Sequence, residues 1–163
     1  MRRWLILAMS IAPCATLAFE VNGIALGARE DDVRRAMPSA YCKPLEWKSG
    51  AADRRCDDAK IRFAGVSAKI TVYLKSGTVQ AFDLRFDAAH RAGVIEQVKA
   101  TWGVPASEAT ETIGRNARSD RRIYKARWAK GGDHALLSVP LDRKRATLSA
   151  WRRGFDEEIY RVR

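Results

Sequence analysis

The stretch from Lys60 to Phe86 constrains the fold of this chain more than any other part of the sequence. Apolar and polar side chains alternate along three consecutive runs within it, and Gly65 and Gly77 mark the two turns between them. Strict alternation of this kind predicts antiparallel strands that bury one face and expose the other to water. Because a second layer must cover the apolar face of such a sheet, we expect helices to pack on that face.

A weaker copy of this pattern lies 65 residues further along the chain, which predicts an internal repeat. At that shift the buried phase is the same in three pairs of positions: Ile70 and Ala135, Val72 and Leu137, and Leu74 and Val139. We therefore expect a single α+β domain built from two tandem units, residues 19–86 and 87–163. Each unit is expected to supply one helix and three antiparallel strands to a shared core, because neither sheet buries its apolar face well alone.

Helices are expected at Ala28–Met37 and Ala88–Trp102, because each of these segments carries an apolar stripe at helical spacing. Asp87 is a suitable N-cap for the second helix, since its side chain can accept a backbone N–H of the first turn. Segments 39–59 and 106–119 are polar, and we expect both to be irregular, with room for one short strand in the second.

The first 18 residues have the features of a secretory signal peptide. Arg2 and Arg3 precede an apolar run that ends in small residues, so we expect cleavage between Ala18 and Phe19. The run has 15 residues, fewer than the ~20 of a spanning helix, which argues against the alternative of an uncleaved anchor. Cys14 lies inside this run, where lipidation is not expected. The mature chain then has no transmembrane segment and is expected in the periplasm.

Export places the two remaining cysteines, Cys42 and Cys56, in an oxidising compartment. An even pair there predicts a disulfide, which in the loop-closure model contributes about 3 kcal/mol. The alternative is a redox or metal pair, but thirteen residues separate the cysteines and no histidine lies near them. We therefore expect a structural disulfide and no metal site.

Positive charge is concentrated in the last third of the mature chain. Residues 115–163 carry 14 Lys/Arg against 6 Asp/Glu, whereas residues 19–114 carry 14 against 13. Such an asymmetry favours an anionic partner. The alternation in the second unit places seven residues on the exposed face of its sheet, namely Arg121, Lys125, Arg127, His134, Arg145, Trp151 and Arg153.

These seven residues are the candidate binding site of the sequence. Arginine is suited to bidentate contacts with phosphate or carboxylate, and tryptophan adds a stacking surface. The expected partner of an exported protein is an anionic envelope component or an acidic protein surface, and nucleic acid is not expected. The alternative is an ordinary solvated face, whose cations guard the sheet against aggregation.

No catalytic motif stands out in the sequence. His90 and His134 are the only histidines and fall in different expected elements, and there is no zinc-protease, nucleophile-elbow or phosphate-loop motif. We therefore expect a non-enzymatic binding or adaptor protein with no catalytic residues and no cofactor. One alternative is a protein inhibitor or envelope-assembly factor that acts through the Cys42–Cys56 loop or a sheet edge. The other is an enzyme whose site is assembled from distant positions.

The segment Gln97–Pro105 resembles the helix end of the SmpA/BamE-type envelope lipoproteins, which reads Gln-Val, three residues, then Leu-Gly-x-Pro. Trp102 takes the place of the leucine here, and the lipidated cysteine of that type is missing. The expected tandem helix-plus-sheet units are also similar to those of the beta-lactamase inhibitor protein group. Both resemblances imply a small exported protein with an α+β architecture.

Overall fold

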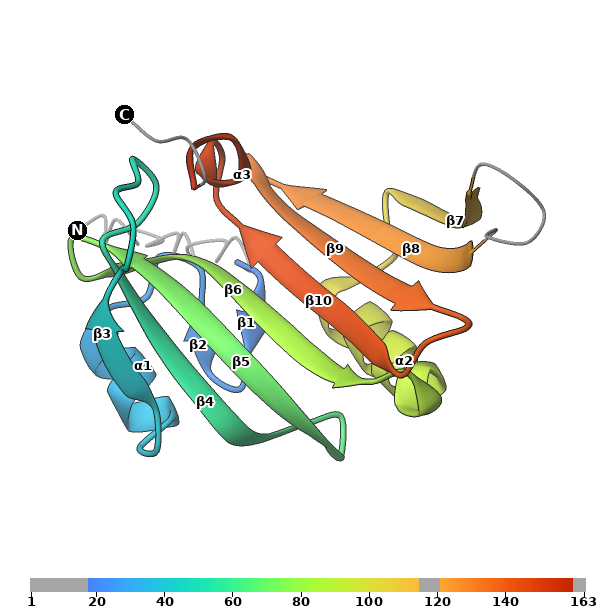
Figure 1. Ribbon diagram of the computed structural model, residues 1–163, viewed down its shortest axis with the longest axis horizontal. Helices are drawn as coiled ribbons and strands as arrows, with labels where there is room; N and C mark the ends of the chain where they lie inside the picture. The colour runs from blue at the N-terminus through green and yellow to red at the C-terminus, as the bar shows by residue number, and fades with distance from the viewer. Residues whose placement is uncertain (1–17, 115–120, 160–163) are drawn as a thin grey trace, which may run out of the picture.

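One large antiparallel sheet dominates the computed structural model, which describes residues 18–114 and 121–159 (Figure 1). Its eight strands follow the order β3-β4-β5-β6-β10-β9-β8-β7. Their bounds are β3 Tyr41–Pro44, β4 Arg54–Phe63, β5 Val66–Lys75, β6 Thr78–Asp87, β7 Ser107–Ile113, β8 Arg121–Lys130, β9 Asp133–Pro140 and β10 Arg145–Trp151. The predicted combination of an antiparallel sheet with few helices is confirmed.

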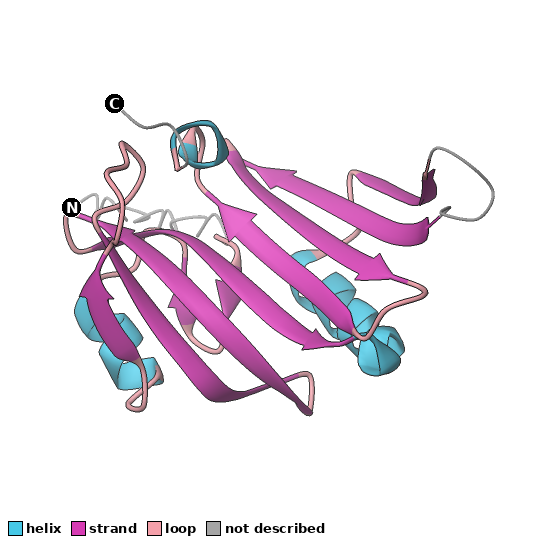
Figure 2. Ribbon diagram, in the orientation of Figure 1, coloured by secondary structure: helices cyan, strands magenta, loops and turns pink. Residues whose placement is uncertain are grey.

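The smaller elements complete the described part of the chain. A short hairpin precedes the sheet, and the two longer helices lie behind the sheet in the view of Figure 2. Their bounds are β1 Glu20–Val21, β2 Ile24–Ala25, α1 Glu30–Ala36, the 3-10 helix η1 Ala88–His90, α2 Arg91–Trp102 and α3 Phe155–Glu158. Within the described residues, no helix has the length and apolar character needed to cross a membrane.

Every second residue of the central strands is buried, as the alternation predicts. On β5 these residues are Ile70, Val72 and Leu74, on β6 Phe82, Leu84 and Phe86, and on β10 Ala146, Leu148 and Ala150. They form one apolar cluster with Val33 of α1 and Val98 of α2. The register pairs Leu84 of β6 with Leu148 of β10, so the two halves of the chain meet in the middle of the sheet.

Trp102, the last residue of α2, is a central member of this core. Its ring packs against Phe19 and Trp128, with centroids 5.0 Å and 5.8 Å away. Its indole N–H donates to the carbonyl of Glu20 at 3.2 Å, and the indole of Trp128 donates to the carbonyl of Gly103 at 2.8 Å. These contacts join α2 to β8 and to the N-terminal arm, by which we mean Phe19 and Glu20.

The predicted disulfide between Cys42 and Cys56 is confirmed. The prediction that segment 39–59 is irregular is wrong, because β3 and the first half of β4 lie in it and pair Cys42 directly with Cys56. These strands show no apolar alternation in the sequence, because charged residues flank Cys56 on both sides. Cys56 itself is fully buried.

Segment 106–119 contains a longer strand than expected, since β7 takes up Ser107–Ile113. Nearly all its side chains are exposed because β7 is an outer strand of the sheet, so no apolar alternation marks it. With β3 and β7 added, each half of the sheet has four strands instead of the three predicted.

The other boundaries shift only slightly. The second helix begins with η1, and the carboxylate of Asp87 caps it by accepting the backbone N–H of Ala89 at 2.9 Å, as predicted. The predicted signal peptide lies outside the described residues except for Ala18. Phe19, the residue expected after cleavage, is completely buried.

Candidate functional site

The side of the sheet opposite the apolar cluster is called the open face here. Its centre carries the alternate residues of the three middle strands, whose cross-strand register arranges them in rows. These rows are Tyr73, Ala81 and Trp151; Thr71, Asp83 and Ser149; Lys69, Arg85 and Thr147; and Asp87 and Arg145. Neighbouring rows lie about 7 Å apart, because each is two residues further along an extended strand.

A groove of about 730 Å³ opens at one end of this face, where β5, β6 and β10 meet the turn between β9 and β10. Five cationic residues line it, and we call it the basic groove: Lys69, Arg85, Arg143, Lys144 and Arg145. Among the described lining residues, Asp87 is the one acidic residue. All five cations are solvent-exposed, so an incoming anion meets them without moving any element of the fold.

In the described part of the chain the five cations have no direct polar partner, although Asp87 lies opposite Arg145 on the neighbouring strand. Lys69 lies directly opposite Arg85 on the neighbouring strand, and like charges in such a pair are destabilising. An anion bound between the two side chains would relieve this repulsion.

The structure distributes the seven residues predicted as a binding site over separate places. Arg145 lines the basic groove. Arg121, Lys125 and Arg127 alternate along β8, which β9 separates from β10. His134 and Trp151 lie at the far end of β10 from Arg145, with ring centroids 6.1 Å apart, and Arg153 follows β10 in the turn before α3.

Glu111 of β7 partly neutralises two cations of β8. Glu111 contacts Lys125 at 2.6 Å and Arg127 at 3.5 Å. The hydrogen bond from Lys125 is the main reason that the pKa of Glu111 lies below its usual value. Glu111 is therefore ionised at neutral pH, and it competes with any external anion for these two cations.

The predicted binding residues do not include four residues of the basic groove, namely Lys69, Arg85, Arg143 and Lys144. The alternation places Lys69 and Arg85 on the polar side of their strands, but residues 19–114 carry 14 Lys/Arg against 13 Asp/Glu and so do not stand out as basic. The missing information was the pairing of β6 with β10, which places Arg85 one row from Arg145 on the adjacent strand, with Lys69 opposite Arg85 on β5. No local pattern in the sequence encodes that long-range pairing.

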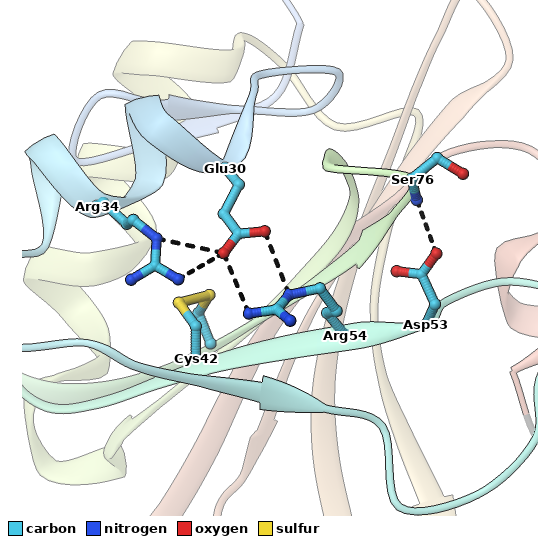
Figure 3. A network of polar contacts seen from close by, with 7 residues as sticks. Glu30, Arg34, Cys42, Asp53, Arg54 and Ser76 are labelled. Atoms are coloured by element: carbon cyan, nitrogen blue, oxygen red, sulfur yellow. Dashed lines mark hydrogen bonds and ion pairs between the residues drawn. A yellow bond between two sulfur atoms is a disulfide. The ribbon is translucent and has the colours of Figure 1, made fainter.

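One group of three potential metal ligands occurs among the described residues, formed by Glu30, Cys42 and Cys56, whose ligand atoms lie within 4.8 Å of one another. Both sulfur atoms belong to the disulfide, so neither is available as a thiolate (Figure 3). Glu30 instead links α1 to the sheet, because its carboxylate contacts Arg34 at 2.6 Å and Arg54 of β4 at 3.2 Å (Figure 3).

Comparison with known proteins finds no matching family model, no matching curated protein and no matching solved structure.

Proposed function

We propose that this chain is an exported, non-enzymatic binding protein of the periplasm, whose basic groove binds a phosphate- or carboxylate-bearing component of the cell envelope. The observation that supports this most is the convergence of five cations on one groove, with no partner for any of their side chains among the described residues. Three of these cations are arginines, which suit bidentate contacts with phosphate and carboxylate.

The size and exposure of the basic groove determine what kind of binding to expect. Its volume of about 730 Å³ lies within the usual range of ligand sites. Because all five cations are exposed, each contributes little alone and salt screens it efficiently. The affinity is therefore expected to come from several simultaneous contacts and to fall steeply with ionic strength.

We also propose that the chain consists of two repeats, residues 19–86 and 87–163, with their helices on one face of the sheet. The strand order supports this, because β3 to β6 and β7 to β10 run inward from opposite edges and meet at β6 and β10. A helix precedes each set of strands, α1 before β3 and α2 before β7. The resemblance to the beta-lactamase inhibitor protein group implies the same kind of architecture. Both repeats contribute cations to the basic groove.

The periplasmic location is a proposal that follows from the predicted signal peptide, and the disulfide is consistent with an oxidising compartment. The mass of the protein purified from the periplasm tests this proposal. We expect a mature chain that begins at Phe19. A protein that keeps its first 18 residues would contradict the proposed export.

Two double variants with the same change in net charge test the binding proposal. Arg85→Glu/Arg145→Glu reverses two charges of the basic groove, and Arg121→Glu/Arg127→Glu reverses two charges on β8. The probes are vesicles of equal parts phosphatidylglycerol and phosphatidylcholine, vesicles of phosphatidylcholine alone, and lipopolysaccharide. The two anionic probes distinguish phospholipid from lipopolysaccharide as the source of phosphate.

We expect the variant of the basic groove to bind at least one anionic probe about tenfold or more weakly than the wild type, since each cation near an anionic surface contributes about 1 kcal/mol. The β8 variant is expected to lose less than about threefold. Equal losses of affinity in the two variants would show that binding depends on net charge and not on the basic groove. Failure of the wild type to bind either anionic probe would also contradict the proposal.

A further inference from the structure

A second, smaller pocket lies on the open face, at the opposite end of β5, β6 and β10 from the basic groove. Its volume is about 250 Å³, and three aromatic side chains line it, Tyr73, Trp151 and Phe155. Two carboxylates, Asp83 and Asp156, also line it, and no lysine or arginine is among its described lining residues. We call it the aromatic pocket, and none of these residues takes part in the proposed binding of anions.

The sheet register explains why a pocket forms here. Ala81 lies between Tyr73 and Trp151 in one row, so a small side chain separates two large ones. The third aromatic wall comes from α3, where the ring of Phe155 packs against Tyr73 with centroids 5.4 Å apart. Asp83 lies in the next row along β6 and places a carboxylate beside these rings.

Within the described residues, the negative charge of the aromatic pocket has no direct partner. Asp83 is half-buried, and within the described ranges neither it nor Asp156 has a hydrogen-bond or ion-pair partner. Thr71, which faces Asp83 across the strands, donates its hydroxyl to Asp57 at 2.7 Å instead. Partial burial of a carboxylate without a partner costs free energy, and a cation bound beside the carboxylate offsets that cost.

We propose that the aromatic pocket binds the ammonium group of a small alkylated amine. The negative faces of aromatic rings attract a cation, and each such contact contributes about 0.5–2 kcal/mol depending on its desolvation. The carboxylate of Asp83 adds a charge of the opposite sign to the ligand. A volume below the roughly 300 Å³ of typical drug-sized sites suits one head group instead of an extended molecule.

This site is independent of the proposed function. The row of Tyr73 and Trp151 lies two rows from that of Lys69 and Arg85, a separation of about 13 Å along the strands. A failure to bind ammonium therefore leaves the anion-binding proposal intact. A failure to bind anions likewise leaves the ammonium-binding proposal intact. A ligand that carries both charges at this spacing would occupy both sites.

Choline and its uncharged isostere 3,3-dimethyl-1-butanol are the probes that test the proposal, because they differ in one atom and in charge. The readout is the NMR resonance of the Trp151 indole N–H, assigned from its absence in Trp151→Phe. We expect choline to shift this resonance in a saturable way and the alcohol to leave it unchanged. A third probe, ethanolamine, distinguishes alkylated from primary ammonium, and we expect it to bind more weakly than choline.

Asp83→Asn supplies the matched variant, since it removes the charge and keeps the shape of the side chain. We expect it to weaken choline binding about fivefold or more, whereas Asp142→Asn, in the exposed turn between β9 and β10, leaves it within about twofold. Thermal unfolding of each variant confirms that it is folded. The proposal would be overturned if choline gave no saturable shift, or if choline and the alcohol gave equal shifts. It would also be overturned if ethanolamine bound as tightly as choline, or if folded Asp83→Asn bound choline as well as the wild type.

Discussion

At the scale of single residues, Phe19 is expected to contribute strongly to the stability of the fold, although it is the expected first residue of the mature chain. Its ring is fully buried and packs on Trp102 at 5.0 Å. Removal of a buried phenylalanine side chain costs about 3–5 kcal/mol. We expect Phe19→Ala to lower the free energy of unfolding in urea by that amount, while Val104→Ala, at a residue 92% exposed, changes it by less than about 0.5 kcal/mol. A loss below about 1 kcal/mol in Phe19→Ala would contradict the role of the arm in the core.

Glu108 couples stability to pH. Its carboxylate accepts hydrogen bonds from Lys99 of α2 at 2.8 Å and from the hydroxyl of Tyr124 of β8 at 2.7 Å, and these bonds lower its pKa. A carboxylate with a lower pKa in the folded state stabilises the fold above its unfolded pKa, and this stabilisation is lost as the pH falls through the folded pKa.

We therefore expect Glu108→Gln to melt below the wild type at neutral pH, with the difference closing as the pH falls below about 4. Thermal unfolding across this pH range provides the measurement. A difference that stays constant with pH would show that the side chain acts by packing and not by charge.

At the scale of elements, the disulfide holds an outer strand of the sheet. It joins β3 to β4 at Cys42 and Cys56, where the strands are directly paired. We expect Cys42→Ser/Cys56→Ser to lower the free energy of unfolding by about 2–4 kcal/mol. Denaturation of the wild type with and without a reductant provides the matching comparison, and equal stability of the two forms would contradict this expectation.

The central strands were predictable from the sequence because each shows one fully apolar side. The buried positions of β5 and β6 follow the alternation between Ile70 and Phe86, and those of β10 follow it from Ala146 to Ala150. The outer strand β3 was missed and β7 was expected only as a short strand, because a strand paired on one side needs fewer apolar residues to be held in place.

The candidate site was predictable only in part. Alternation identifies which side chains face away from the core, and it correctly placed Arg145 on the open face. It does not determine which strands become neighbours, so Lys69 and Arg85 could not be joined to Arg145. The predicted cations of β8 looked equivalent in the sequence, but Glu111 pairs with two of them in the fold.

At the scale of the whole molecule, the two halves of the chain join along β6 and β10, and this seam carries the basic groove. The groove exists only if both halves are folded and paired, because Lys69 and Arg85 come from one half and Arg145 from the other. Binding of an anion should therefore stabilise the complete fold, by an amount that rises with ligand concentration.

The location of bound anion is the most direct test of the account. Glycerol phosphate, the soluble part of a phospholipid head group, is titrated into the isotopically labelled protein at low salt. We predict that the backbone NMR shifts concentrate at Lys69, Arg85 and Arg145 and that added salt reverses them. Shifts that instead concentrate at Arg121, Lys125 and Arg127, or that spread evenly over all surface cations, would contradict the assignment of the basic groove as the binding site.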